Sequence, residues 1–273
     1  MNKEVIKCCE RAHYFMQLSS YFTELMDLPG VSFAYTNLVS DTWYNQAYNI
    51  QDLSSTELAE SNESILSKSR KYFEDHNREL CFYLTPATTP TNFKEFLKNH
   101  GFTEFDKEAW MFYNFSKEDL LSTNPRIKIK DITDTELDLF SEVYCNTLPG
   151  PEVAAYVQCV KNGFLSRPPF ININYFVAFY DEKPVGMLSL LIFGKYAGLY
   201  AVAVDEGYQN MGICKALVAK SVDICRKQDI EYLFLQTGNG EDSQVAFEHL
   251  NFETKFVRIG YIQESALKNI QHG

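Results

Sequence analysis

The chain has 273 residues, enough for one large domain or two small ones, and its 45% apolar and 22% charged residues are typical of a globular protein. The formal net charge of -11 would repel phosphate backbones, which disfavours nucleic acid as a partner and would suit a cationic acceptor. No stretch reads as a signal peptide or a membrane span, so we expect no membrane partner.

The cysteines favour a cytoplasmic protein with reduced, buried thiols. The seven of them include no CxxC pair and form no cluster with histidine at metal-ligand spacing. This is not the pattern of a zinc site or of a disulfide framework, so we expect no bound metal.

The first half of the chain alternates between helical and strand patterns. Apolar residues recur at helical spacing from Lys3 to Leu28, up to a turn at Pro29-Gly30. Further along, the patterns predict a strand over 31–36, a helix over 54–75, a strand over 80–85, a helix over 92–99 and a strand over 108–115. The polar segment 116–126 contains a proline, and it marks the expected boundary between a domain at 1–122 and a domain at 123–273.

The second half predicts a mixed sheet with helices, an α/β (α+β) fold. Its expected strands cover 126–132, 175–180, 184–193, 196–204, 231–237 and 255–262, and its expected helices cover 134–145, 152–161 and 242–250, with another that begins at Gly212. Eleven of the thirteen glycines lie from Gly150 onward. A ligand that needs close approach to the backbone is therefore expected in this half.

An internal similarity links the two halves. Residues 79–102 read "ELCFYLTPATTPTNFKEFLKNHGF" and residues 231–252 read "EYLFLQTGNGEDSQVAFEHLNF". Both segments have Glu-x-x-Phe-x-x-Thr, then a loop, a short helical stretch and a Phe after a small or polar residue. We interpret this similarity as a duplication.

The stretch "VAVDEGYQNMGICKAL", residues 202–217, is where a strand runs into a helix through a turn. Gly207 and Gly212 have the spacing of a P-loop, but Ile213 stands where that motif needs a lysine. The glycines of a dinucleotide fingerprint are also missing. The remaining explanation is a diphosphate that binds the backbone N–H groups at the helix N-terminus. These groups have no partner within the helix, and the helix dipole favours an anion.

The motif Gln209-x-x-Gly212-x-Cys214 after the strand that ends at Val204 resembles the pyrophosphate loop of the GNAT superfamily, the coenzyme A-dependent N-acyltransferases. That loop has Arg or Gln, two residues, Gly, one residue, then Gly or Ala, so Cys214 is a departure of small volume. The resemblance covers residues 126–262 in element order. The segments "FKEFLKNHGF" and "AWMFYNF" in the first half also resemble a tandem arrangement, in which a degenerate GNAT-like domain precedes a complete one.

The resemblance implies a set of contacts with acetyl-CoA as co-substrate. Backbone amides of the loop would hold the coenzyme A diphosphate, and the preceding strand would pair with the pantetheine amides and position the acetyl carbonyl. Asn239, in the loop after "LFLQT", is a further candidate, although turn chemistry alone also accounts for it. The loop residues are Gln209, Asn210, Met211, Gly212, Ile213 and Cys214, and the strand residues are Val202, Ala203 and Val204.

The expected general acid of this family is missing from the sequence. Many GNAT proteins have a tyrosine in a segment like Tyr-x-x-x-Gly-Phe, where this chain has Phe247 and Asn251. Tyr200 is the candidate substitute, because strand alternation places it on the face of Val202 and Val204. A packed core tyrosine is the alternative reading of Tyr200. Weaker candidates are His249, Glu142 and Glu152, each equally explained as a solvated polar residue.

Three functions therefore remain open. The favoured one is an acyltransferase other than an aminoacyltransferase, an N-acetyltransferase that acts by direct transfer to an amine-bearing acceptor, small molecule or protein. The alternative, favoured by Phe247, is a non-catalytic acyl-CoA-binding sensor or scaffold. Aminoacyl transfer from tRNA on a similar tandem fold is disfavoured by the acidic charge. A covalent acyl-enzyme on Cys214, whose pKa a helix N-terminus would lower, is a further and weaker hypothesis.

Overall fold

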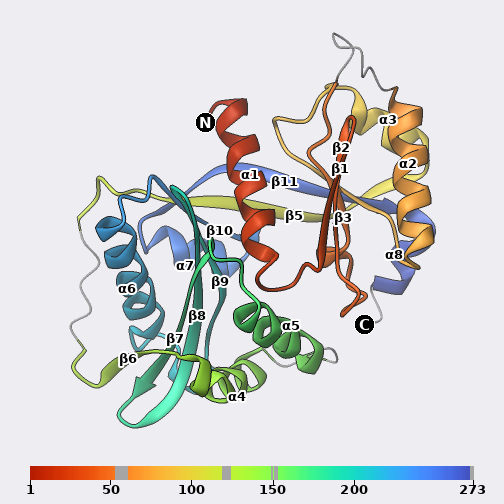
Figure 1. Ribbon diagram of the computed structural model, residues 1–273. Helices are drawn as coiled ribbons and strands as arrows, with labels where there is room; N and C mark the ends of the chain where they lie inside the picture. Colours follow the sequence, from red (N-terminus) through yellow and green to blue (C-terminus); the bar gives the residue numbers. More distant parts are fainter. Residues whose placement is uncertain (53–60, 119–123, 149, 151–152, 271–273) are drawn as a thin grey trace. The chain divides into compact units, whose positions relative to one another are not determined.

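The computed structural model describes residues 1–52, 61–118, 124–148, 150 and 153–270, and the chain divides into two compact units (Figure 1). One unit consists of Met1–Trp110, Thr237–Glu241 and Thr254–Gly273, and the other consists of Met111–Gln236 and Asp242–Glu253. The segment 116–126, expected as a boundary, belongs to the second unit, and its residues 119–123 lie outside the described part.

The first unit begins with α1 (Lys3–Gln17), followed by the hairpin β1 (Glu24–Leu28) and β2 (Val31–Tyr35). The helix predicted from Lys3 to Leu28 is therefore wrong beyond Gln17. Its last part is a strand, because Leu28 pairs with Val31 across a tight turn in which Gly30 has a φ of +82°. That left-handed conformation is open to glycine and strains residues with a side chain.

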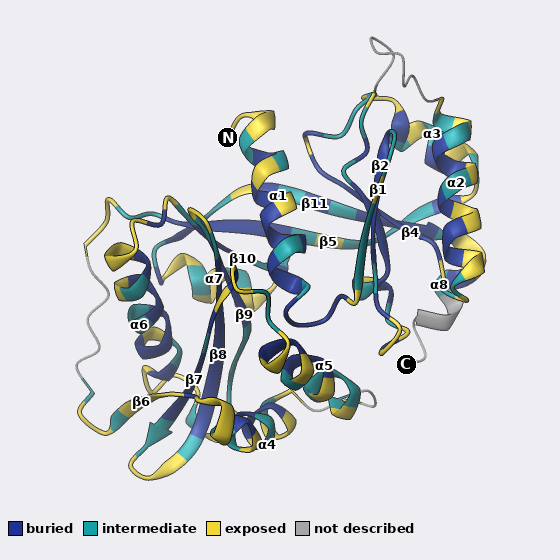
Figure 2. Cartoon of the chain, in the orientation of Figure 1, coloured by how far each residue is buried: buried dark blue, intermediate teal, exposed yellow. Residues whose placement is uncertain are grey.

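The remaining elements of this unit come from both ends of the chain. They are η1 (Thr42–Tyr44), β3 (Gln46–Tyr48), α2 (Asn62–Asp75), β4 (Cys81–Leu84), α3 (Phe93–Asn99), β5 (Phe102–Tyr113), β11 (Phe252–Gln263) and α8 (Glu264–Ile270). The strands follow the order β1-β2-β3-β4-β11-β5, and β11 pairs antiparallel with β4. The last strand of the chain thus completes the sheet of the first unit. Figure 2 shows buried strands of this unit in dark blue, and its core combines aliphatic side chains with aromatic ones, which include Phe33, Phe73, Phe82, Phe93 and Tyr261.

The second unit contains the expected meander followed by helix, strand and helix. Its elements are β6 (Ile127–Asp131), η2 (Asp134–Glu136), α4 (Leu137–Thr147), α5 (Val153–Leu165), β7 (Asn172–Tyr180), β8 (Lys183–Phe193), β9 (Tyr196–Val204), η3 (Glu206–Tyr208), α6 (Ile213–Lys227), β10 (Tyr232–Gly238) and α7 (Asp242–Glu248). Strands β6 to β9 are antiparallel neighbours, β9 pairs in parallel with β10, and the end of β5 lies beside β10.

Helices cover both faces of this sheet. Ile213 of α6 lies against Gly186 on one face of β8, so closely that an added Cβ on Gly186 would be 3.0 Å from its side chain. On the other face, Phe140 of α4 stacks on Tyr175, with ring centroids 4.6 Å apart, and Tyr175 is the cross-strand partner of Ser189. Gly186 and Ser189 are three positions apart on β8 and therefore face opposite sides.

The two segments of the internal similarity fold alike. The first forms β4 and α3 and ends at the first residue of β5, and the second forms β10 and α7 and ends at the first residue of β11. Each of the two helices has 7 residues, and each of the two final strands has 12. The sequence pattern shared by the segments therefore encodes the same strand–helix–strand unit twice.

All seven cysteines are free thiols; four of them are buried, whereas Cys8 and Cys145 are exposed, so the expectation of buried thiols holds only in part. Within the described ranges, every helix is too short or too polar to cross a bilayer.

Candidate functional site

Strand β9 carries a break in its pairing just before the loop of interest. Its partner β8 places Ser189 opposite Tyr200 and Met187 opposite Ala203, so β9 has one residue more than β8 over the same stretch. Ala201, in the extra segment, has a φ of +48°, a left-handed conformation that is found in one type of β-bulge. A bulge redirects the strand and the side chains that follow it.

The bulge corrects one sequence-based expectation. Simple alternation predicts Tyr200, Val202 and Val204 on one face. In the structure Tyr200 pairs with Ser189 and Val204 pairs with Gly186, so these two side chains face opposite sides of the sheet. Tyr200 lies on the α4 side, and Val204 lies on the α6 side.

The parallel strands β9 and β10 pair only over their first residues. The register runs from Tyr196 opposite Tyr232 to Gly198 opposite Phe234, while β9 continues to Val204. Over Val202, Ala203 and Val204 the strand is half-buried, and its register is with β8. The edge of β9 that leads to the loop therefore offers backbone groups with which an extended ligand could pair.

The loop after β9 is held at its start and exposed at its end. The side chain of Asp205 accepts a hydrogen bond from the Gly207 N–H at 3.0 Å, and Tyr208 is half-buried. The next four residues, Gln209, Asn210, Met211 and Gly212, are all exposed. Asn210 and Gly212 have φ values of +61° and +88°, and such left-handed positions next to helical ones turn successive N–H groups toward one side, as in anion-binding nests.

Helix α6 begins at this loop with its first N–H groups uncovered. Gly212 is the N-cap, and α6 has no side-chain hydrogen bond at this cap among the described residues and no acidic residue in its first turn. A Cβ on Gly212 would meet only the Ile127 side chain, at 3.8 Å, so its positive φ rather than crowding explains the glycine. The residues present fit a diphosphate. The positive end of the helix dipole and the first N–H groups of α6 lie there, and its first turn holds no carboxylate.

Cys214 does not have the character of a nucleophile. Its side chain is half-buried in the first turn of α6, and burial raises the pKa of the thiol to about 11. The pKa is thus raised, opposite to the lowering expected from the helix N-terminus, because burial disfavours the thiolate. A covalent acyl-enzyme on Cys214 loses its physical basis.

The candidate acids lie in different environments. The Tyr200 hydroxyl lies back over Gly198, where an added Cβ would approach it to 2.4 Å, so it points toward the start of β9. Phe247 packs edge-on against Phe252, with ring centroids 5.6 Å apart, and offers no proton. His249 and Glu142 are exposed, and Glu152 lies outside the described residues.

Asn239 and the loop belong to different units. It belongs to the first unit, where its backbone N–H donates to the Lys107 carbonyl at 2.8 Å. The other proposed contacts, from Val202 to Cys214, all belong to the second unit. Within the described residues, no group of three or more His, Cys, Asp or Glu side chains is arranged to hold a metal ion.

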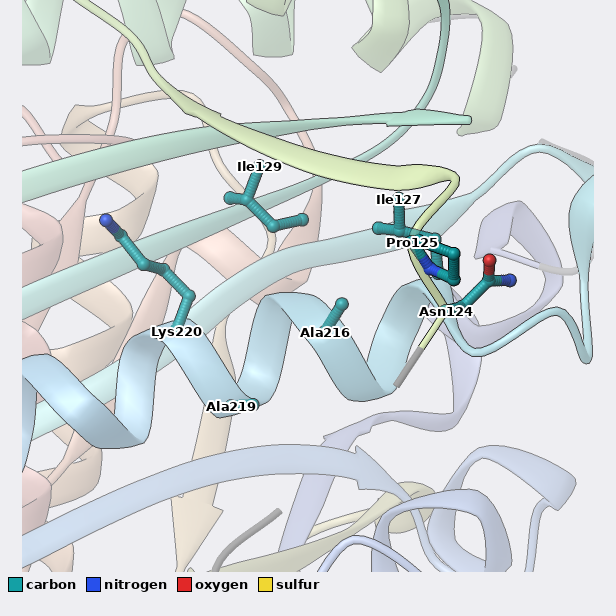
Figure 3. Close-up of a pocket in the computed structure, with 7 residues that line it drawn as sticks. All are labelled: Asn124, Pro125, Ile127, Ile129, Ala216, Ala219 and Lys220. Atoms are coloured by element: carbon teal, nitrogen blue, oxygen red, sulfur yellow. The ribbon is translucent and has the colours of Figure 1, made fainter. Parts of the chain in front are cut away.

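Sequence reasoning missed the contribution of Asn124, which lay in the expected linker. Its side-chain amide donates to the Met211 carbonyl at 3.2 Å and so holds the loop from the side of β6. Asn124 also borders an open groove of about 530 Å³ between β6 and α6 (Figure 3), lined by Asn124, Pro125, Ile127, Ile129, Ala216, Ala219 and Lys220. No local sequence signal marks this contact, because it joins residues far apart in the chain.

Comparisons with known proteins show the family of this chain and folds similar to its own. Residues 112–252 match the model of the acetyltransferase (GNAT) family, and a search of the curated proteins gave no match. A GCN5-related N-acetyltransferase from Kribbella flavida is 12% identical and superposes with a TM-score of 0.68 over 93% of each chain. A tandem GNAT protein from the clavulanic acid biosynthesis pathway is 10% identical, with a TM-score of 0.65 over 85% of this chain and 77% of that one. The expected α/β fold with two tandem GNAT-like domains is confirmed.

Proposed function

Because the chain belongs to the acetyltransferase (GNAT) family, whose chemistry is acyl transfer from coenzyme A to an acceptor, we propose that it is an N-acetyltransferase that moves the acetyl group of acetyl-CoA directly to an amine. One observation carries the proposal: the edge of β9 leads through the exposed loop Gln209–Gly212 to the N-terminus of α6, whose N-cap makes no side-chain hydrogen bond with the described residues. A ligand with a diphosphate at one end and amides along its length matches both parts.

In this proposal the chain's own residues divide the binding between them. The N–H groups from Asn210 to Cys214 hold the diphosphate, and Gln209 leads into them. Backbone groups of Val202, Ala203 and Val204 pair with the pantetheine amides and place the acetyl carbonyl near a backbone N–H that can stabilise the oxyanion. We propose that this site belongs to the domain 123–273, and that the domain 1–122 is a degenerate partner.

The leaving thiolate needs a proton. Tyr200 is our candidate for the acid, because its hydroxyl lies near Gly198 on the strand that carries the proposed pantetheine contacts. General acid catalysis contributes about a hundred- to ten-thousand-fold in rate, and positioning can contribute more. A chain without the usual tyrosine can therefore still catalyse the transfer. Asn239 stays a proposed cofactor contact without geometric support from its own unit.

The alternative is a sensor or scaffold that binds acyl-CoA without catalysis, and Phe247 is the observation that favours it. An acceptor screen separates the two functions. The purified chain is incubated with acetyl-CoA and with polyamines, lysine peptides, peptides with free N-termini and aminoglycosides, and free thiol is measured. Acceptor-dependent thiol release that stays at background without protein supports the enzyme. Tight acetyl-CoA binding without thiol release from any amine supports the sensor.

A further inference from the structure

Tyr208 is the point at which the exposed loop is attached to the sheet. It is half-buried, while Glu206 and Gly207 before it and Gln209 after it are exposed. Its ring packs edge-on against Tyr180, with centroids 5.6 Å apart, and the Lys183 ammonium lies 4.6 Å from its centroid on a cation–π contact. Contacts of both kinds are stabilising and depend on the geometry of the ring.

The surface that receives this ring is fixed by strand pairing. Tyr180 is the last residue of β7, opposite Lys183 on β8 and opposite Ile127 on β6. The Lys183 ammonium also reaches the Asp205 carboxylate at 3.4 Å. Three paired strands therefore hold Tyr180 and Lys183 in place.

Two backbone hydrogen bonds fix the chain on either side of Asp205. The Asp205 N–H donates to the Val185 carbonyl at 2.8 Å, and the Tyr208 N–H donates to the Asp205 carbonyl at 2.8 Å. Beyond Tyr208 the chain is exposed up to Gly212, and the Met211 carbonyl is held by Asn124. The orientation of the loop N–H groups thus depends on a ring at one end and on an amide at the other.

We propose that Tyr208, seated on Tyr180 and Lys183, is a positioning residue that holds the loop Gln209–Gly212 ready for the diphosphate of acyl-CoA. This inference rests on the proposed function of that loop. Tyr208 acts through the backbone that follows it and does not itself contact the ligand. If the ring is removed, the loop spends less time in the binding conformation, and the apparent affinity falls by the same fraction.

The test compares three variants by calorimetric titration with CoA. Tyr208→Ala is expected to weaken CoA binding about tenfold, which is about 1.4 kcal/mol. Tyr208→Phe keeps the ring and is expected to bind like the parent. Tyr232→Ala is the matched control, because Tyr232 stacks on Tyr196 with centroids 5.5 Å apart and lies 5.5 Å from the Lys195 ammonium, at the opposite end of β9. It is expected to bind CoA like the parent.

A second ligand separates positioning from general damage. S-acetylpantetheine lacks the diphosphate, so its affinity, measured by ligand-observed NMR, is expected to be the same for the parent and Tyr208→Ala. Equal CoA affinity of parent and Tyr208→Ala overturns the inference, and so does an equal loss for both ligands or for the Tyr232→Ala control. A parent that binds no CoA at all overturns the proposed function, and with it this inference.

Discussion

Arg258 and Glu108 form a buried ion pair in the first unit, in which Nε and Nη2 of the guanidinium each lie 2.7 Å from the same carboxylate oxygen. The Arg258 side chain is 2% exposed and lies 4.2 Å above the Tyr83 ring, and its Nη1 donates to the Tyr14 hydroxyl at 2.7 Å. The pair joins β11, from the end of the chain, to β5 and, through Tyr14, to α1. This unit therefore depends on a charge supplied by the other half of the sequence.

The first prediction concerns the loss of that charge. Arg258→Met leaves Glu108 buried without its partner, so we expect the free energy of unfolding to fall by about 3–5 kcal/mol, measured by urea denaturation. Lys71→Met is the control, because Lys71 pairs with Asp75 on the exposed face of α2, where solvent screens the pair, and it should leave stability nearly unchanged. A loss for Arg258→Met as small as that of the control would show that the pair contributes little.

The second prediction concerns the pH dependence of stability. Glu10 on α1 is 2% exposed, and its Oε1 finds no hydrogen-bond partner in the part of the chain that the structure describes. Burial, only partly offset by Arg258, raises the pKa of this carboxyl from 4.5 to about 7. The folded chain therefore keeps a proton that the unfolded chain releases at lower pH, so the stabilisation is complete below pH 4.5 and is lost as the pH rises through 7.

The size of this effect follows from the pKa difference. The shift of the Glu10 carboxyl corresponds to about 3 kcal/mol between the two ends of the window. Glu10→Gln removes the titration but keeps the shape of the side chain. We expect the melting temperature of the parent, relative to Glu10→Gln, to fall between pH 5 and pH 8. If the melting temperatures of the two proteins changed with pH in parallel, the raised pKa of Glu10 would be refuted.

The third prediction concerns Gly212. Its φ of +88° is left-handed, as is the φ of +57° at Gly194, and an added Cβ would meet open space at Gly194 and only Ile127 at Gly212. Alanine at either position is therefore expected to cost about 1 kcal/mol of stability through the backbone alone. Only Gly212→Ala should weaken CoA binding, because only there does the backbone shift turn loop N–H groups away from the diphosphate. Equal CoA affinity of the two variants in a titration would count against the loop assignment.

The fourth prediction concerns Cys214. With the pKa of its thiol raised to about 11, it is expected to stay protonated at neutral pH. Intact-protein mass spectrometry after incubation with acetyl-CoA should therefore show no acetyl adduct on Cys214, and Cys214→Ala should bind CoA like the parent. Cys8 and Cys145, which are exposed, are substituted beforehand, so that they cannot account for an adduct. An acetyl group on Cys214 at pH 7 would revive the covalent mechanism.

The strand–loop–helix junction was predictable because its signals are local. The apolar run to Val204, the turn residues and the apolar face of α6 lie next to one another in the sequence. What the sequence missed depends on distant partners. Residues 24–28 have helical periodicity and become a strand only because β2 pairs with them. The bulge at Ala201 is set by the register with β8, and the burial of Arg258 requires Glu108, which is 150 positions away.

The measurement that tests the central claim most directly is a calorimetric titration of the purified chain with acetyl-CoA, free CoA and ATP. The account predicts that both CoA species bind and that ATP does not, because the site combines a diphosphate loop with the edge of β9, which only the pantetheine arm can pair with. Gly212→Ala should weaken both CoA species. No heat and no thermal shift with acetyl-CoA or CoA, or ATP binding as tight as theirs, would contradict the account.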